Sequence, residues 1–137
     1  MGFTVRRVDY YYTTVNDPPA EAYALLSHLA GLGVNLVALT AVPMGPDSTQ
    51  LTLFPEDPLR LADAAKKAGI VLNGPHAALL VQGDDEPGRL GSIHARLHDA
   101  GAEVFASSGV TDGRGHFGYV VYVRPEHSER AARALEV

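Results

Sequence analysis

The sequence predicts an α+β fold made of two β-α-β-β-α-β units, each an antiparallel sheet with two helices on one face. Strand-like and helix-like segments follow one another in the same order in both halves of the chain. The halves also align at a single offset of 68 residues (101 − 33 = 68). Five pairs with equivalent roles share this offset: Gly33 and Gly101, Leu29 and Leu97, Leu25 and Ile93, Asp17 and Asp85, and Leu51 and Tyr119. We therefore expect an internal duplication.

The first half alternates strand and helix signals. Phe3 to Val15 is rich in β-branched and aromatic residues and predicts a strand. Ala20 to Ala30 has apolar residues at the 3.6-residue period of a helix that packs on one side. The remaining segments are strands over 34–42 and 49–54, a helix over 59–68 and a short strand over 70–72. Asn73-Gly74-Pro75 is a turn sequence and is expected to link the two halves.

The second half repeats this order but stops one strand short. It predicts strands over 77–82, 103–110 and 117–123, helices over 87–100 and 126–135, and a turn over 112–115. The offset places Phe3 to Val5 opposite residues 71–73, so we expect this segment to supply the missing edge strand of the second half. The alternative is that it begins one long first strand. The expected repeats are residues 1–74 and 75–137.

Composition excludes several classes of protein. The 137 residues carry a net charge of −5, so no basic face for nucleic acid is expected. The chain has no cysteine, which excludes disulfides, thiolate metal ligands and cysteine nucleophiles. No apolar run approaches the roughly 20 residues of a membrane span, and no apolar signal core follows the first arginines. We expect a cytoplasmic protein that does not bind membranes.

The segment from Asp84 to Leu90 connects a strand to a helix and is the candidate binding loop. Pro87 suits the first helical turn, where its missing N–H has no cost. Gly88 has no Cβ, so another group can approach the backbone closely. The N–H groups at a helix start, with the positive end of the helix dipole, suit a carboxylate. The alternative is a plain turn in which Asp84 or Asp85 caps the helix.

No catalytic or metal constellation stands out. His94 and His98 are four residues apart, a spacing that can chelate a metal, but no third ligand accompanies them and a solvent-facing pair is favoured. Ser107-Ser108-Gly109 lacks the pattern of a hydrolase nucleophile. Gly113-Arg114-Gly115 is typical of a hairpin turn rather than a phosphate loop. We expect neither enzymatic activity nor a metal or cofactor.

The tyrosine run of the first strand has alternating directions. Tyr10 and Tyr12 should point to one face of the strand and Tyr11 to the other. One face would pack against helices and the other would fill an interface, to which Tyr119 and Tyr122 could add; half-buried core tyrosines explain the run equally well.

The duplicated unit, with Asp85-Glu86-Pro87-Gly88-Arg89-Leu90 between its first strand and first helix, resembles the ACT domain family. The resemblance covers residues 8–72 and 76–137. It implies two ferredoxin-like units side by side, with an amino acid or similar small zwitterion bound between the loop of one unit and the second strand of its neighbour. It also implies a sensor without a catalytic domain of its own, which regulates a metabolic enzyme and forms a homo-oligomer.

The resemblance also assigns binding residues. The better-preserved loop would use Asp85, Gly88, Arg89 and Leu90. In the first repeat the equivalents are Asp17, Ala20 and Glu21, and because alanine replaces the loop glycine this site is impaired or differently tuned. The opposing second strands would offer Asn35 and Leu36 from the first half and Glu103 and Val104 from the second. Two other functions remain open: an interaction module without a ligand, and a small enzyme, since fold does not fix function.

Overall fold

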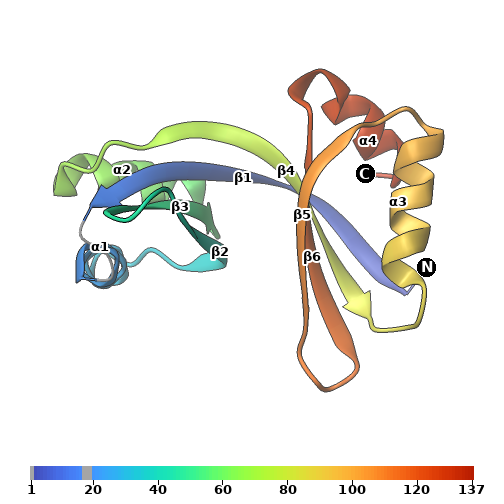
Figure 1. Ribbon diagram of the computed structural model, residues 1–137, viewed down its shortest axis with the longest axis horizontal. Helices are drawn as coiled ribbons and strands as arrows, with labels where there is room; N and C mark the ends of the chain where they lie inside the picture. The colour runs from blue at the N-terminus through green and yellow to red at the C-terminus, as the bar shows by residue number, and fades with distance from the viewer. Residues whose placement is uncertain (1, 17–19) are drawn as a thin grey trace. The chain divides into compact units, whose positions relative to one another are not determined.

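The computed structural model describes residues 2–16 and 20–137, which form six strands and four α-helices (Figure 1). In chain order the elements are β1 (Phe3–Asn16), α1 (Ala20–Gly31), β2 (Leu36–Pro43), β3 (Ser48–Pro55), α2 (Pro58–Ala68), β4 (Asn73–Asp84), α3 (Arg89–Asp99), β5 (Val104–Thr111), β6 (His116–Val123), the short 3-10 helix η1 (Pro125–His127) and α4 (Ser128–Ala134). The expected α+β class is confirmed, and the order of elements matches the prediction except at residues 70–72, where the expected separate strand is missing.

The chain divides into two compact units that share two strands. The N-terminal unit is Asp9–His76, and the C-terminal unit is Met1–Val8 together with Ala77–Val137. The hydrogen-bonded strand order is β2-β3-β1-β4-β6-β5. The boundaries between the units lie after Val8, inside β1, and after His76, inside β4. Each of these two strands therefore contributes one part to each unit.

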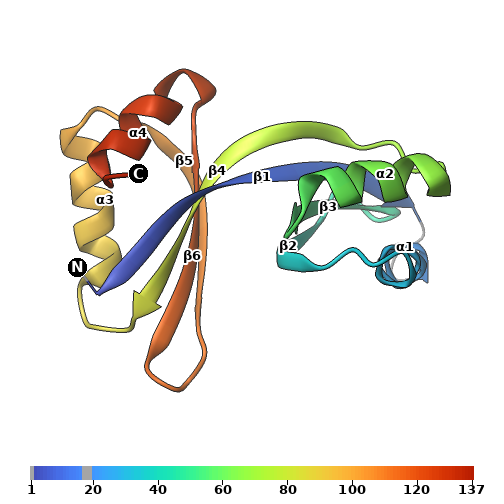
Figure 2. The ribbon, with the colours of Figure 1, turned by 180° about the vertical axis from the view of Figure 1, so that it is seen from behind.

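The C-terminal unit packs α3 and α4 against one face of its strands (Figure 2). Ile93 and Leu97 from α3 are fully buried, as the helical period predicts. They meet alternate residues of β4 and β6 and the inner face of α4. Phe3 and Val5 of β1 pack against the same core, and the Asp84 N–H donates to the Gly2 carbonyl at 2.8 Å. The first residues of β1 therefore act as a strand of this unit.

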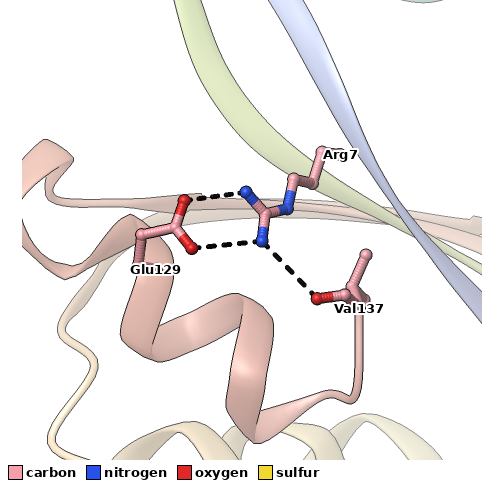
Figure 3. Close-up of polar contacts among 3 residues, drawn as sticks. All are labelled: Arg7, Glu129 and Val137. Carbon is pink, nitrogen blue, oxygen red and sulfur yellow. Dashed lines mark hydrogen bonds and ion pairs between the residues drawn. The ribbon is translucent and has the colours of Figure 1, made fainter.

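An ion pair fixes this first part of β1 to α4 (Figure 3). The Arg7 guanidinium donates to both Glu129 carboxylate oxygens, at 2.8 and 3.2 Å, and to the Val137 backbone oxygen at 3.5 Å. The hydrogen bond and the charge of Arg7 hold the pKa of Glu129 below its ordinary value.

The N-terminal unit has its own core, built from β1, β3 and both of its helices. Its buried side chains are Tyr11, Val15, Leu29, Leu51, Leu53, Leu61 and Ala64. Tyr10 and Tyr12 point away from this core: the Tyr10 ring lies 5.3 Å from that of Phe54, and the Tyr12 ring stacks on His76 at 5.3 Å. The predicted alternation of the tyrosines is thus confirmed.

Two predicted boundaries are wrong. Residues 70–72 form no strand, and β4 runs through the expected link Asn73-Gly74-Pro75. Contacts with β1 hold the segment extended: Thr13 Oγ1 donates to the Val71 carbonyl at 2.9 Å, and a Cβ on Gly74 would lie 2.8 Å from the Tyr11 ring. The predicted helix 126–135 is likewise divided into η1 and α4.

Candidate functional site

The candidate loop follows β4 and turns at Pro87 and Gly88 before α3 begins at Arg89. Gly88 has a φ of +81°, which a helical residue cannot adopt, so it occupies the N-cap position. The prediction that Pro87 lies in the first helical turn is therefore wrong, and so is the alternative in which Asp84 or Asp85 is the N-cap. Glycine offers no side chain to the first N–H groups of α3, which have no partners within the helix.

A cavity of about 350 Å³ lies against this loop, within the C-terminal unit. Its walls are the start of α3, the end of β5 and the start of β6. The lining residues are Asp85, Glu86, Gly88, Arg89, Leu90, Gly91, Gly109, Val110, Thr111, Phe117 and Gly118. All four residues predicted for the second-repeat loop thus line one cavity. The opposite wall, from β5 and β6, was not predicted.

The Arg89 side chain holds the loop in place through contacts within the C-terminal unit. Its side chain is only 14% exposed, and its guanidinium pairs with Glu86 at 3.1 Å. Its Nε donates to the Asp84 carbonyl at 3.3 Å, and its guanidinium carbon lies 5.4 Å from the centre of the Phe3 ring. Arg89 therefore ties the loop to β1, and its charge is already balanced by Glu86.

The β5–β6 hairpin is fastened beside the cavity. The Asp112 carboxylate accepts the backbone N–H of Arg114 at 2.6 Å and that of His116 at 3.1 Å. The backbone hydrogen bond from Arg114 is the main reason why the pKa of Asp112 lies below its ordinary value. Gly113 and Gly115 have positive φ, as the hairpin prediction requires, and the Asp85 N–H donates to the Gly115 carbonyl at 2.9 Å. Loop and hairpin are thus joined by a backbone hydrogen bond.

His94 turns inward rather than toward solvent. Its Nε2 shares a hydrogen bond with the Tyr119 hydroxyl, so the expectation of a solvent-facing pair holds only for the exposed His98. Tyr119 is 6% exposed and belongs to the core, so of the two alternatives for the tyrosines the core position, not the interface, holds for Tyr119. A Cβ on Gly109, the residue opposite Tyr119 on β5, would lie 2.8 Å from the Tyr119 ring.

The remaining predicted residues lie elsewhere. Asn35 donates to Glu56 at 2.6 Å, and Leu36 packs on the core of the N-terminal unit. Glu21 accepts the Asn16 N–H at 2.5 Å, and Ala20 is the exposed first residue of α1. Asp17 lies outside the described residues.

In the C-terminal unit, Glu103 and Val104 lie at the far end of β5 from the cavity. Glu103 pairs with Arg124 at 2.6 Å, and Val104 packs on the core. The structure does not bring them to the loop of their own unit.

Two features are absent from the described residues. Residues 2–16 and 20–137 contain no group of three or more histidine, aspartate or glutamate side chains placed to hold a metal ion. Over the same residues, no helix has the length and apolar character needed to cross a membrane.

Comparisons with known proteins show the fold. No protein-family model matches the chain, and no curated protein matches it. Protein BT0572 from Bacteroides thetaiotaomicron superposes with a TM-score of 0.82 at 15% identity, over 96% of this chain and 88% of that one. The regulatory subunit of aspartate kinase superposes with a TM-score of 0.65 at 17% identity for Thermus thermophilus and 0.64 at 15% for Thermus flavus. Both comparisons cover 99% of this chain and 95% of the other. The chain shares their fold.

Proposed function

We propose that this chain is a regulatory protein of the tandem ACT type, which binds an amino acid or a similar small zwitterion and is not itself an enzyme. The observation that carries the proposal is the cavity of about 350 Å³ bordered by Asp85, Gly88, Arg89 and Leu90. The similarity in fold between this chain and the regulatory subunits of two aspartate kinases supports a role in regulation.

The start of α3 supplies the recognition of an anionic group. The Arg89 N–H donates to the Glu86 carbonyl at 3.1 Å, so the N–H groups of Leu90 and Gly91 are the ones that can receive an anion, and the helix dipole places partial positive charge there. Because Arg89 is paired with Glu86, a ligand carboxylate would rest on backbone N–H groups rather than on this guanidinium. Leu90 and Phe117 offer apolar surface to the rest of the ligand.

Regulation would follow from differential binding. A ligand shifts an equilibrium only by the difference in its affinity for the two states. The loop and the hairpin are joined through Asp85 and Gly115, so a ligand that contacts both walls would favour one arrangement of them. A metabolic enzyme that contacts this chain would respond to that arrangement. We further propose that the protein works as a cytoplasmic homo-oligomer in which Asn35 and Leu36 of a second copy of the chain complete the site, as the resemblance implies.

The second candidate is an interaction module without a ligand. β5 is the last strand of the hydrogen-bonded order, and residues 105–111 are all exposed. Phe105 is 55% exposed and Val110 is 74% exposed. An exposed edge with large apolar side chains favours pairing with another chain.

A thermal-shift screen of the twenty amino acids decides between the two functions. A ligand that binds only the folded state adds about 2.7 kcal/mol of stability at a hundred times its Kd. We expect at least one amino acid to raise the melting temperature in a concentration-dependent way. If none does, the ligand-free interaction module is the better account.

A pair of variants then locates the site. Gly91 lines the cavity, adopts helical φ and has no atom within 4 Å of a Cβ position, so Gly91→Leu adds bulk without backbone strain. Gly31 at the end of α1 is equally open and serves as the control in Gly31→Leu. We expect the first variant alone to lose the ligand-induced shift. An equal shift in both variants would place the ligand elsewhere.

A further inference from the structure

The cavity beside the loop has three large apolar side chains in its walls. Leu90 comes from the first turn of α3, Val110 from the end of β5 and Phe117 from the start of β6. Leu90 is 40% exposed and Val110 is 74% exposed, although side chains of this kind are normally buried. Exposed apolar side chains that border one cavity indicate a surface that a ligand covers.

The charges around the cavity are few and mainly negative. Its titratable side chains are Asp85, Glu86 and Arg89, and the last two neutralise each other at 3.1 Å. The other polar side chains of the lining are those of Asp85 and Thr111, and Asp85 is exposed at the rim. Arg89 is the cationic side chain of the lining, and because it is paired with Glu86 it is not available to an acidic side chain of a ligand.

We propose that this cavity selects amino acids with an uncharged, apolar side chain, and that Asp85 receives the ligand ammonium group. The inference rests on the proposed function and names the class of ligand for the same site. Leu90, Val110 and Phe117 cover the ligand side chain. An acidic side chain would meet Asp85 without a balancing cation, and a basic one would have to bury its charge against apolar walls.

The expected differences in affinity between amino acids follow from the burial of the ligand side chain against the apolar walls. Each methylene group moved from water to an apolar surface contributes about 0.8 kcal/mol, which corresponds to about a fourfold gain in affinity. Leucine has three more carbon atoms than alanine, so we expect it to bind at least about tenfold more tightly. Aspartate and lysine should bind at least about tenfold more weakly than leucine: Asp85 would repel the aspartate side chain, and with lysine Asp85 is already occupied by the ligand ammonium group while the side-chain charge faces apolar walls.

The internal duplication provides a matched control. Val42 on β2 lies 68 residues before Val110 (110 − 42 = 68) and is 45% exposed, in the other unit. Val110→Asp should lower leucine affinity at least about tenfold, whereas Val42→Asp should leave it unchanged. For the ammonium group, Asp85→Asn should weaken binding several-fold, and Asp47→Asn, in the exposed β2–β3 turn, should not.

Isothermal titration of the full chain with leucine, alanine, aspartate and lysine tests the proposal. Preference for leucine that is lost in Val110→Asp supports it. Tighter binding of aspartate or lysine than of leucine would overturn the ligand class and leave the proposed function intact. Failure of all twenty amino acids to bind the unaltered protein would overturn both. If Val110→Asp does not fold, Leu90→Asn replaces it, and unchanged leucine affinity in that variant would equally refute the assignment.

Discussion

Replacing Gly83 by alanine tests how the first residues of β1 join the C-terminal unit. A Cβ on Gly83 would lie 2.2 Å from the Gly2 carbonyl oxygen and 2.5 Å from the Phe3 Cα. Both are backbone atoms, so a change of rotamer cannot relieve the clash. The strand would have to separate from β4, which breaks the hydrogen bond of 2.8 Å from the Asp84 N–H to Gly2. Phe3 would also lose its packing on the core and on Arg89.

The expected cost is the sum of two effects. Overpacking costs about 1–3 kcal/mol, and a lost backbone hydrogen bond adds about 1 kcal/mol. Gly83→Ala should therefore lower the free energy of unfolding by about 2–4 kcal/mol. At about 4 °C for each kcal/mol, the melting temperature should fall by roughly 8–16 °C.

Urea unfolding followed by circular dichroism measures this cost. Gly118 on the neighbouring strand β6 is the matched control, because no atom lies within 4 Å of its Cβ position. Gly118→Ala should change stability by less than about 0.5 kcal/mol. Equal stability of the two variants would show that Phe3 and Gly2 do not pack on β4, and the strand sharing would be refuted.

Three further predictions concern polar contacts of the C-terminal unit. Tyr119→Phe removes the hydroxyl that bonds His94 and should cost about 1–3 kcal/mol in urea unfolding. Arg7→Gln should raise the pKa of Glu129 toward its ordinary value in an NMR titration. Because the folded-state pKa of Glu129 is depressed, its stabilising contribution is present at neutral pH and is lost as pH falls through that pKa, so Arg7→Gln should be less sensitive to acid than the unaltered protein. Asp112→Asn, which weakens the acceptor for the Arg114 and His116 N–H groups, should destabilise the protein at neutral pH and have little effect in strong acid, where Asp112 is protonated in both states.

Local patterns were enough to predict most elements and much of both cores. The helical period identified Leu29, Ile93 and Leu97, which are all at most 2% exposed. Alternation along β1 separated Tyr11 from its neighbours Tyr10 and Tyr12. These predictions hold because a residue's burial in a helix or strand depends first on which face it occupies.

Turn chemistry was less reliable where distant contacts decide the backbone. Asn73-Gly74-Pro75 has the composition of a linker, but pairing with β1 makes it part of a strand. Glycine is required at position 74 because the Tyr11 ring leaves no room for a Cβ there. Pro87 suits a first helical turn, but Gly88 adopts positive φ and delays the helix to Arg89. Neither outcome can be read from local propensity, because both depend on tertiary packing or on one dihedral angle.

The candidate site was predictable on one side only. The loop residues form a contiguous motif, whereas Val110 and Phe117 are brought to it by strand register. Asp84 pairs with His116, which places the start of β6 next to the end of β4. Thr111 in turn pairs with Phe117 across the hairpin. A hairpin predicted at 112–115 gives that second pairing, but nothing local shows that β6 rather than another strand lies beside β4.

Two charged residues at the predicted repeat offset have opposite roles. Glu21 and Arg89 are separated by the common offset (89 − 21 = 68). Arg89 turns toward Phe3 and is neutralised by Glu86, and its N–H donates to the Glu86 carbonyl at 3.1 Å, so an anion would be received by the next N–H groups of α3, those of Leu90 and Gly91. Glu21 instead places its own carboxylate on the Asn16 N–H at 2.5 Å, where a ligand carboxylate approaching that amide would meet like charge. The proposed carboxylate site at the start of α3 therefore meets no repulsion from the residue at this position, whereas an anion at the start of α1 would be repelled by the negative charge of Glu21.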